Sequence, residues 1–229
     1  MQAIKAYTQI FNDVDGQDIL KKIEIIGRTC YKSTDKITED SAPKFVANLI
    51  KRGHEAMLEH ASITVKFVTD RGISHEIVRH RIASYAQEST RYCNYSKDKF
   101  GNELTFIVPD FLTYGSKEFN IWKEAMKQAE RNYFAMLEAG SKPEEARSVL
   151  PNSLKTELIM TADLREWRNF FKLRAANSTG SAHPQMLEIT RPLLAEFKKL
   201  VPVVFDDITY EGEGTKSDFD EIFPKNTRK

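Results

Sequence analysis

Residues 62–92 read SITVKFVTDRGISHEIVRHRIASYAQESTRY, and this stretch sets how the chain folds around its predicted site. Apolar residues alternate with polar ones between Ile63 and Phe67, which predicts a half-buried strand. Asp70 is suited to cap a helix after this strand, and that helix ends where the basic triplet 79–81 begins. The sequence therefore predicts a strand and a helix that deliver three basic residues together.

The triplet 79–81, Arg-His-Arg, gathers groups of like charge, which repel one another at contact distance. A fold that gathers cations usually holds an anion with them. If the chain after the triplet is extended, its side chains alternate between two faces, and one face carries Gln87, Ser89 and Arg91. An amide, a hydroxyl and a guanidinium together suit a nucleotide phosphate and a polar base. The alternative for the triplet alone is that it complements the dipole of the preceding helix.

The composition limits the class of protein. The 229 residues are 41% hydrophobic and 29% charged, with a net charge of +1. This length supports a core in one large domain or two small ones, and the charge balance argues against a general nucleic-acid binder. Cys30 and Cys93 form neither a CxxC pair nor a zinc pattern, which favours a reducing, cytoplasmic setting. We expect no membrane span and no signal peptide, since no apolar run is long enough.

Helix and strand patterns are mixed along the chain without a regular βαβ alternation. This favours an α+β fold, with mixed helices packed on a mainly antiparallel sheet in a single domain. We expect the domain to cover residues 1–205 and a loosely ordered tail to cover 206–229. Helices are predicted at 15–28, 41–53, 70–78, 116–138, 143–150, 163–176 and 184–200, and strands at 1–10, 62–68, 104–108 and 157–160.

The helix predicted at 163–176 begins with Asp163 and Glu166, the D-x-x-E pattern of a capping box. This pattern is a sufficient structural reason for Asp163. Arg165 and Asn169 are four residues apart and share a different face of the same helix.

Arg174 falls on the apolar stripe of this helix, between Phe170 and Phe171 in angular position. An arginine on an apolar stripe either extends to solvent at the helix end or is buried against an anion. Both readings stay open from the sequence, and a uracil ring would suit the second.

The common nucleotide and metal motifs are absent. The sequence contains neither GxGxxG nor GxxxxGK[ST]. The segment GHEAMLEH at 53–60 fails the HExxH pattern because its second histidine follows six residues after the first. His75 and His80 are five residues apart and point to different sides of a helix. We therefore expect no metal site, and a flavin or nucleotide would be held by arginines, histidines and backbone.

The sequence RHRIASYAQES at 79–89 resembles the RHR(X)7S signature of the flavin-dependent thymidylate synthases. The resemblance continues in chain order over roughly residues 25 to 200. Further segments that resemble elements of this family are GRTCY (27–31), GHEAMLEH (53–60), ARSVLP (146–151), DLR (163–165), NF (169–170), LR (173–174) and AHPQ (182–185).

The resemblance implies synthesis of dTMP from dUMP, with methylenetetrahydrofolate as carbon donor and NADPH as source of electrons through FAD. It implies a set of FAD-binding residues, namely Ala56, Arg79, His80, Arg81, Gln87, Asp163, Arg165, Asn169 and His183. It implies a set of dUMP-binding residues, namely Glu76, Arg79, Gln87, Glu88, Ser89, Thr90, Arg91, Arg147 and Arg174.

Two of these residues are implied to be catalytic. Arg174 would polarise the uracil and favour ionisation at its N3, because a guanidinium stays cationic at any working pH. Ser89 would orient dUMP. The family is typically a homotetramer with sites built from several subunits, so the expected partners are small molecules and further copies of the chain, with no nucleic acid and no membrane. Four positions depart from a common family pattern: Gln87 stands for a glutamate, Ala86 for an asparagine, Ala56 for a threonine and Asp163 for an asparagine near the flavin.

Two other functions use parts of the same sequence. A thymidylate synthase that uses a cysteine nucleophile could use Cys93, which lies close to the signature. A non-catalytic nucleotide- or RNA-binding module could use the Arg-, His- and Tyr-rich stretch 79–95, although the near-zero net charge and the distant Arg147 and Arg174 argue against it. Salt-sensitive RNA binding without a bound flavin would favour the module.

The cysteine alternative is tested by substitution. We expect Cys93→Ala to keep its thymidylate synthase activity and Arg174→Ala to lose nearly all of it, because the resemblance replaces cysteine attack by flavin chemistry. The measurement is dTMP formation by both purified variants beside the wild type. An inactive Cys93→Ala protein that is still folded would contradict the assignment.

Overall fold

A four-stranded antiparallel sheet forms the centre of the fold in the computed structural model, which describes residues 1–11, 13–93, 95 and 102–212. The strand order is β2–β3–β6–β4, and β3 pairs with β6 along its whole length. A second sheet pairs β1 and β5 in parallel. The strands are β1 (Gln2–Ile4), β2 (Tyr7–Ile10), β3 (Ser62–Asp70), β4 (Ser84–Gln87), β5 (Thr105–Ile107) and β6 (Lys155–Asp163). The predicted α+β class with a mainly antiparallel sheet is confirmed.

The helices agree closely with the sequence pattern. They are α1 (Gly16–Thr29), α2 (Ser41–Lys51), α3 (Arg71–Ile77), α4 (Lys117–Glu138), α5 (Pro143–Ala146), α6 (Leu164–Arg174) and α7 (Pro184–Leu200), with 3-10 turns at Thr34–Lys36, Glu55–His60 (η2) and Arg147–Val149 (η4). Side chains of Asp15, Asp70, Ser116 and Asp163 accept hydrogen bonds from the first turns of α1, α3, α4 and α6. These caps satisfy backbone N–H groups that a helix leaves unpaired, so the caps fix where each helix begins.

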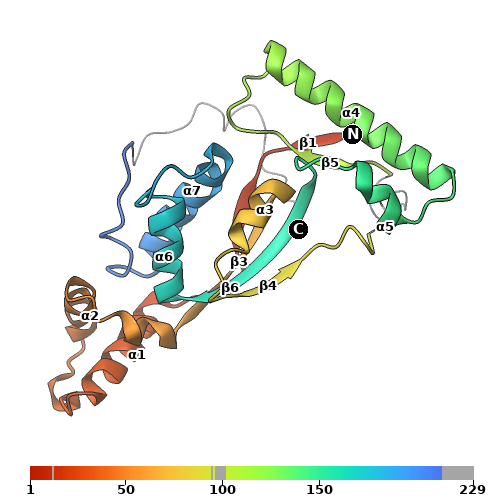
Figure 1. Cartoon of the computed structure of the whole chain (residues 1–229). Coiled ribbons are helices and arrows are strands. Elements are labelled where there is room, and N and C mark those ends of the chain that lie inside the picture. Colours follow the sequence, from red (N-terminus) through yellow and green to blue (C-terminus); the bar gives the residue numbers. More distant parts are fainter. Residues whose placement is uncertain (12, 94, 96–101, 213–229) are drawn as a thin grey trace.

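The elements form two apolar cores. The larger core joins β3 and β6 to α1, α3, α6 and α7, and the smaller one lies beneath α4. Figure 1 shows α4 over β1 and β5, at the end of the molecule opposite to α1 and α2. Within the described residues, no helix is both long and apolar enough to cross a membrane.

Aromatic packing fixes the rotation of α6. Trp167 lies 6.4 Å from Phe67 of β3 and 5.1 Å from Phe197 of α7, measured between ring centroids. Phe170 and Phe171 are also fully buried. Burial of each of these rings contributes roughly 2–3 kcal/mol to folding. Because this apolar face of α6 is held against the sheet and α7, the polar residues that flank it are carried to fixed positions beside α3.

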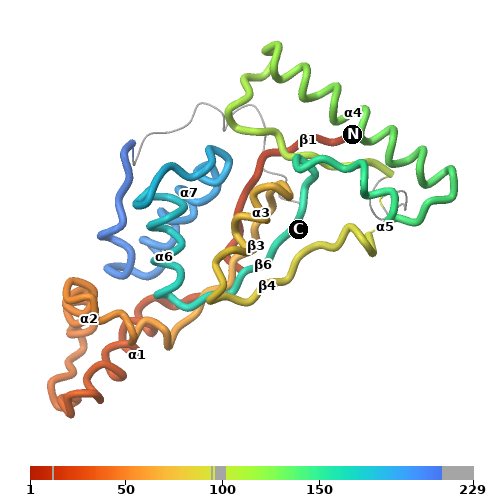
Figure 2. The backbone as a smooth tube through the Cα atoms, in the orientation of Figure 1, coloured from red at the N-terminus to blue at the C-terminus, as the bar shows by residue number. Residues whose placement is uncertain are grey.

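The segment 62–87 brings the predicted site residues onto the sheet. Figure 2 shows the chain leaving β3, turning into α3 and returning as β4, with β6 between the two strands. Asp70 ends β3 and caps α3, where its Oδ1 accepts from the N–H of Ile73 at 2.7 Å. The basic triplet 79–81 follows the end of α3, as predicted.

The strand prediction was wrong at residues 1–10 and too short at residues 157–160. The single strand expected at 1–10 is two short strands in different sheets, separated by Lys5 and Ala6. The strand expected at 157–160 is longer, because β6 pairs with β3 on one side and β4 on the other. A central strand gains backbone hydrogen bonds from both neighbours. These neighbours lie far away in sequence, so the local pattern of apolar residues does not reveal how long the strand is.

The described start of the expected tail is anchored to α6. Arg168 is 1% exposed, and its guanidinium bonds both carboxylate oxygens of Asp207 at 2.6 and 2.8 Å. The same guanidinium bonds Glu55 of η2 at 3.1 Å and the backbone carbonyl of Val204. Ile208 is buried in the larger core. Residues 213–229 of the expected tail lie outside the described residues.

Candidate active site

His80 is the centre of a group of polar side chains between the end of α3 and one face of α6. The residue is 6% exposed, and its Nδ1 lies 3.0 Å from Oε1 of Glu166. Its Nε2 accepts a hydrogen bond of 3.1 Å from Nε of Arg174. We call the five residues that meet here the α3–α6 cluster: Glu76, His80, Glu166, Asn169 and Arg174.

Arg174 is held on two sides within this cluster. Its Nε donates to His80, and its Nη1 donates to Oε2 of Glu76 at 3.2 Å. The side chain is 23% exposed, so part of the guanidinium still faces solvent. The guanidinium is therefore only half-buried and pairs with the carboxylate of Glu76 at the end of α6, so neither of the two readings from the sequence holds in full. Its Nη2 makes no hydrogen bond with any residue that the structure describes.

The contacts of His80 fix its charge and its tautomer. Burial lowers the pKa of His80 below its usual 6.5, and the nearby Arg174 lowers it further, although Glu166 acts in the opposite direction. Geometry leads to the same state, because Nε2 needs a lone pair to accept from a guanidinium. The ring is therefore neutral near pH 7, with its proton on Nδ1 facing Glu166. Both ring nitrogens are engaged within the chain.

Glu166 is the residue of this cluster that sequence reasoning assigned to a different role. Asp163 does cap α6, with its Oδ1 accepting from the N–H of Glu166 at 2.8 Å. The carboxylate of Glu166 is directed to His80, and it also accepts from Nδ2 of Asn169 at 3.2 and 3.3 Å. The expected reciprocal capping box was therefore wrong in its second half. A signal was present, since Glu166 lies one turn before Phe170, and a carboxylate beside an apolar stripe needs a partner.

The prediction that alternate residues after the triplet share one face was wrong. β4 ends at Gln87, and the chain then turns, with the N–H of Cys93 bonding the carbonyl of Ser89 at 3.0 Å. The Nε2 of Gln87 donates to Ser74 of α3 at 2.9 Å and to Thr156 of β6 at 3.2 Å. The turn arises because the side-chain oxygen of Ser89 accepts from the N–H of Arg91 at 3.2 Å, which competes with an extended chain.

The segment 88–92, which we call the turn loop, is fixed at its start by Glu88. One carboxylate oxygen of Glu88 accepts from the hydroxyl of Tyr95 at 3.0 Å, and the other accepts from Nζ of Lys155 at 3.1 Å. Burial alone would lower the pKa of Lys155, but Glu88 and Glu157 more than offset it, and the pKa is raised. Lys155 therefore stays charged and anchors the loop to β6. Lys155 and Tyr95 belong to no recognisable sequence motif, so sequence reasoning did not assign them to the site.

The rest of the turn loop meets the region of α5 and η4. Arg147 donates from Nη1 to the hydroxyl of Thr90 at 3.3 Å, so two residues predicted to bind the substrate lie together. Arg91 donates from Nε to Glu144 at 3.0 Å. The Arg91–Glu144 pair is 58% and 40% exposed, and such exposed pairs contribute little to stability.

Arg79 and Arg81 are exposed and point away from the packed core. Neither guanidinium bonds an acid in the described part of the chain. Two such cations so close in the chain are suited to an anion with several oxygens.

The remaining predicted residues are spread around these groups. Arg165 is exposed and pairs with Glu59 at 2.5 Å, and Ala56 is exposed in η2. His183 begins α7, where its Nδ1 accepts from the N–H of Gln185 at 3.3 Å. Among the described histidines, cysteines and acids, no group of three or more is arranged to hold a metal ion.

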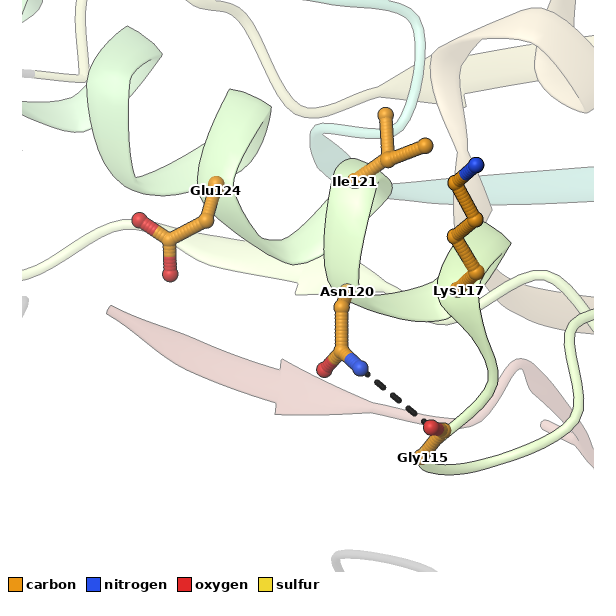
Figure 3. Close-up of a pocket in the computed structure, with 5 residues that line it drawn as sticks. All are labelled: Gly115, Lys117, Asn120, Ile121 and Glu124. Carbon is orange, nitrogen blue, oxygen red and sulfur yellow. Dashed lines mark hydrogen bonds between the residues drawn. The ribbon is translucent and has the colours of Figure 1, made fainter.

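Two clefts lie near the start of α4. One, of about 750 Å³, is lined by Gly115, Lys117, Asn120, Ile121 and Glu124. In Figure 3 the amide of Asn120 donates to the carbonyl of Gly115, and none of the predicted site residues lines this cleft. The other, of about 710 Å³, includes Glu76 and His183 in its lining. It therefore adjoins the α3–α6 cluster through Glu76.

Comparisons with known proteins identify the family and the fold of this chain. Residues 14–203 match the family model described as "Thymidylate synthase complementing protein". The flavin-dependent thymidylate synthase of Pyrococcus abyssi is 33% identical over 169 residues, covering 73% of this chain and 67% of that protein. The same enzyme of Geobacter sulfurreducens is 32% identical, covering 81% and 80%. A solved structure of the UMP/dUMP methylase PolB from Streptomyces cacaoi, bound with 5-Br dUMP, has a TM-score of 0.72 at 21% identity, covering 90% of this chain and 95% of that one. The last likeness shows a shared fold.

The neutral state of His80 predicts a pH dependence of stability. Because its folded-state pKa is lowered, the unfolded chain binds the proton more readily below about pH 6.5, and stability falls as the pH decreases through that value. We expect the free energy of unfolding to fall more steeply between pH 7 and pH 5.5 in the wild type than in His80→Asn. Urea unfolding at both pH values measures this, with the exposed His60→Asn as control. Equal slopes for wild type and His80→Asn would contradict the assignment.

Proposed function

This chain belongs to the family of flavin-dependent thymidylate synthases, and on that basis we propose that it converts dUMP to dTMP by reductive methylation. In the proposed reaction methylenetetrahydrofolate provides the carbon, and FAD reduced by NADPH provides the hydride. The observation that carries the proposal is Arg174, a partly exposed guanidinium fixed on two sides by His80 and Glu76.

Arg174 is proposed to bind and polarise the uracil. Its guanidinium is cationic at any working pH, and its Nη2 is available to an acceptor on the ring. Negative charge that develops on the pyrimidine would be stabilised by this fixed cation more strongly than by water, because the cation is held in place and its partner His80 is buried. Loss of the N3 proton raises electron density at C5, which is the carbon that must attack the methylene group. Glu76, beside Arg174, is proposed to contact the same nucleotide.

The turn loop is proposed to bind the phosphate and sugar of dUMP. Ser89, Thr90, Arg91 and Arg147 present two hydroxyls and two guanidiniums in one region of the molecule. The exposed pair that Arg91 makes with an acid is weak, so a phosphate can replace that acid at little cost. Ser89 orients the nucleotide in this proposal and forms no covalent bond with it.

The residues around the basic triplet fit FAD. Arg79 and Arg81 are exposed guanidiniums that bond no described acid, which is the donor set a diphosphate needs. Bound FAD would supply the hydride, and the chain's residues would hold it in place. Further contacts to FAD are proposed for the other residues that the family resemblance indicates, namely Ala56, His80, Gln87, Asp163, Arg165, Asn169 and His183.

A homotetramer with shared sites is part of the proposal. In a single chain, no hydrogen bond or ion pair between described residues joins the α3–α6 cluster to the turn loop. Binding the uracil at one and the phosphate at the other is therefore proposed to use groups from two subunits. In such an arrangement many arginines meet only around a bound anion, which avoids their mutual repulsion in the free monomer.

The visible absorption spectrum of the purified protein tests this function. We expect a flavin spectrum, either directly or after incubation with FAD, and a change in that spectrum when dUMP is added. Arg174→Ala should keep the flavin spectrum and lose most of the response to dUMP, whereas Arg79→Ala should weaken FAD binding. A protein that stays colourless after incubation with FAD would contradict the proposal, and salt-sensitive RNA binding by that protein would favour a non-catalytic module.

A further inference from the structure

Glu166 is buried at a cost that capping of α6 does not explain. It is 6% exposed, and a carboxylate removed from water loses its hydration, which hydrogen bonds must replace. Asp163 alone caps the helix, so the carboxylate of Glu166 is not needed there. It accepts instead from Asn169 and faces Nδ1 of His80 at 3.0 Å.

The contact between His80 and Arg174 depends on which ring nitrogen of His80 carries the proton. Nε of Arg174 is only a donor, so Nε2 of His80 must offer a lone pair across the 3.1 Å contact. In the opposite tautomer two N–H groups would face each other at Nε2. A lone pair on Nδ1 would then also face the carboxylate of Glu166. Glu166 therefore selects the tautomer that can hold Arg174.

We propose that Glu166 is a positioning residue for the proposed reaction, and that it acts through His80 to fix the guanidinium of Arg174. The inference rests on the proposed function and deepens it, because Glu166 touches neither the nucleotide nor the flavin in this account. With Nε held by His80 and Nη1 held by Glu76, the plane of the guanidinium is set, and Nη2 makes no hydrogen bond with a described residue. A uracil ring would then meet a donor whose direction is already determined.

The rest of the surroundings keeps this chain of bonds in place. The ring of Phe170 lies edge-on to His80, with 4.9 Å between the ring centroids. The hydroxyl of Tyr85 donates to the backbone carbonyl of His80 at 2.7 Å and to that of Ile77 at 3.0 Å. Backbone and ring of His80 are thus both fixed, so the proton position is the main freedom left to it.

The first test reads the tautomer of His80 without any assay of activity. The nitrogen spectrum of the wild-type protein labelled with 15N in its histidines, with His80→Asn to assign the signal, should show His80 protonated at Nδ1. In Glu166→Leu the signal should move toward the Nε2-protonated form, which is the more common one in water. An Nε2-protonated His80 in the wild type would overturn the proposal.

The second test measures turnover. We expect kcat of Glu166→Leu to fall by roughly 100-fold, since a displacement of about 1 Å at a reacting group can have that effect. Glu166→Gln should keep most of the activity, because its amide oxygen can still accept from Nδ1 and the amide of Asn169 can turn to match. The kcat is measured at saturating FAD, because Glu166 bonds His80 and Asn169, which are proposed FAD contacts. If Glu166→Gln keeps its activity while Glu166→Leu loses it, the hydrogen-bond acceptor at this position is what matters, and neither the charge nor the size of the side chain explains the effect.

A matched control comes from Glu24, which is 1% exposed and bonds Arg28 at 2.7 Å and Ser41 at 2.8 Å in a different part of the fold. Glu24→Leu should lower stability as Glu166→Leu does and leave kcat unchanged. Wild-type kcat in a folded Glu166→Leu protein would overturn the proposal. If Glu166→Leu does not fold, the proposal is tested by the activity of Glu166→Gln and by the nitrogen spectrum of the wild type. An inactive Glu166→Gln or an Nε2-protonated His80 would then overturn it. A wild type that makes no dTMP would contradict the proposed function. The tautomer of His80 would still show whether Glu166 sets the position of its proton.

Discussion

The hydrogen bond from Arg174 to a neutral His80 is the interaction on which the candidate site depends. It joins two segments that are 94 residues apart in sequence, and it exists only while His80 keeps a lone pair on Nε2. Aromatic packing of α6 against β3 and α7 brings the two residues together, and burial favours the uncharged ring. The apolar core and the geometry of the candidate site are therefore linked, because the packing that stabilises α6 also sets the state of His80.

Much of this arrangement could be predicted from periodicity and capping. The alternating residues from 62 to 68 and the cap at Asp70 located β3 and α3, and helical spacing placed Arg174 beside an apolar stripe. These predictions succeeded because the governing interactions lie within a few residues. Glu166 was assigned to a cap because its true partner, His80, lies 86 residues away in sequence. The turn at Ser89 was missed because it depends on a single side-chain oxygen, which accepts from the N–H of Arg91.

The site has two parts that differ in how they are held. The α3–α6 cluster is organised by hydrogen bonds around the buried pair His80 and Glu166, with one neutral ring at its centre. The turn loop is more exposed and is fixed by ion pairs, above all the bond from Lys155 to Glu88. A buried group suits recognition and polarisation of a flat pyrimidine, whereas exposed cations suit capture of a charged phosphate. This division of roles is consistent with a site that assembles around dUMP from more than one subunit.

The measurement that bears closest on this account is the nitrogen resonance of dUMP labelled with 15N at N3 and bound to the FAD-loaded protein. If Arg174 is held ready to stabilise negative charge on the ring, N3 should move toward the resonance of the deprotonated pyrimidine. The same nucleotide bound to Arg174→Ala should keep the resonance of the neutral ring. A neutral N3 resonance in the wild type, equal to that of the variant, would contradict the role assigned to Arg174.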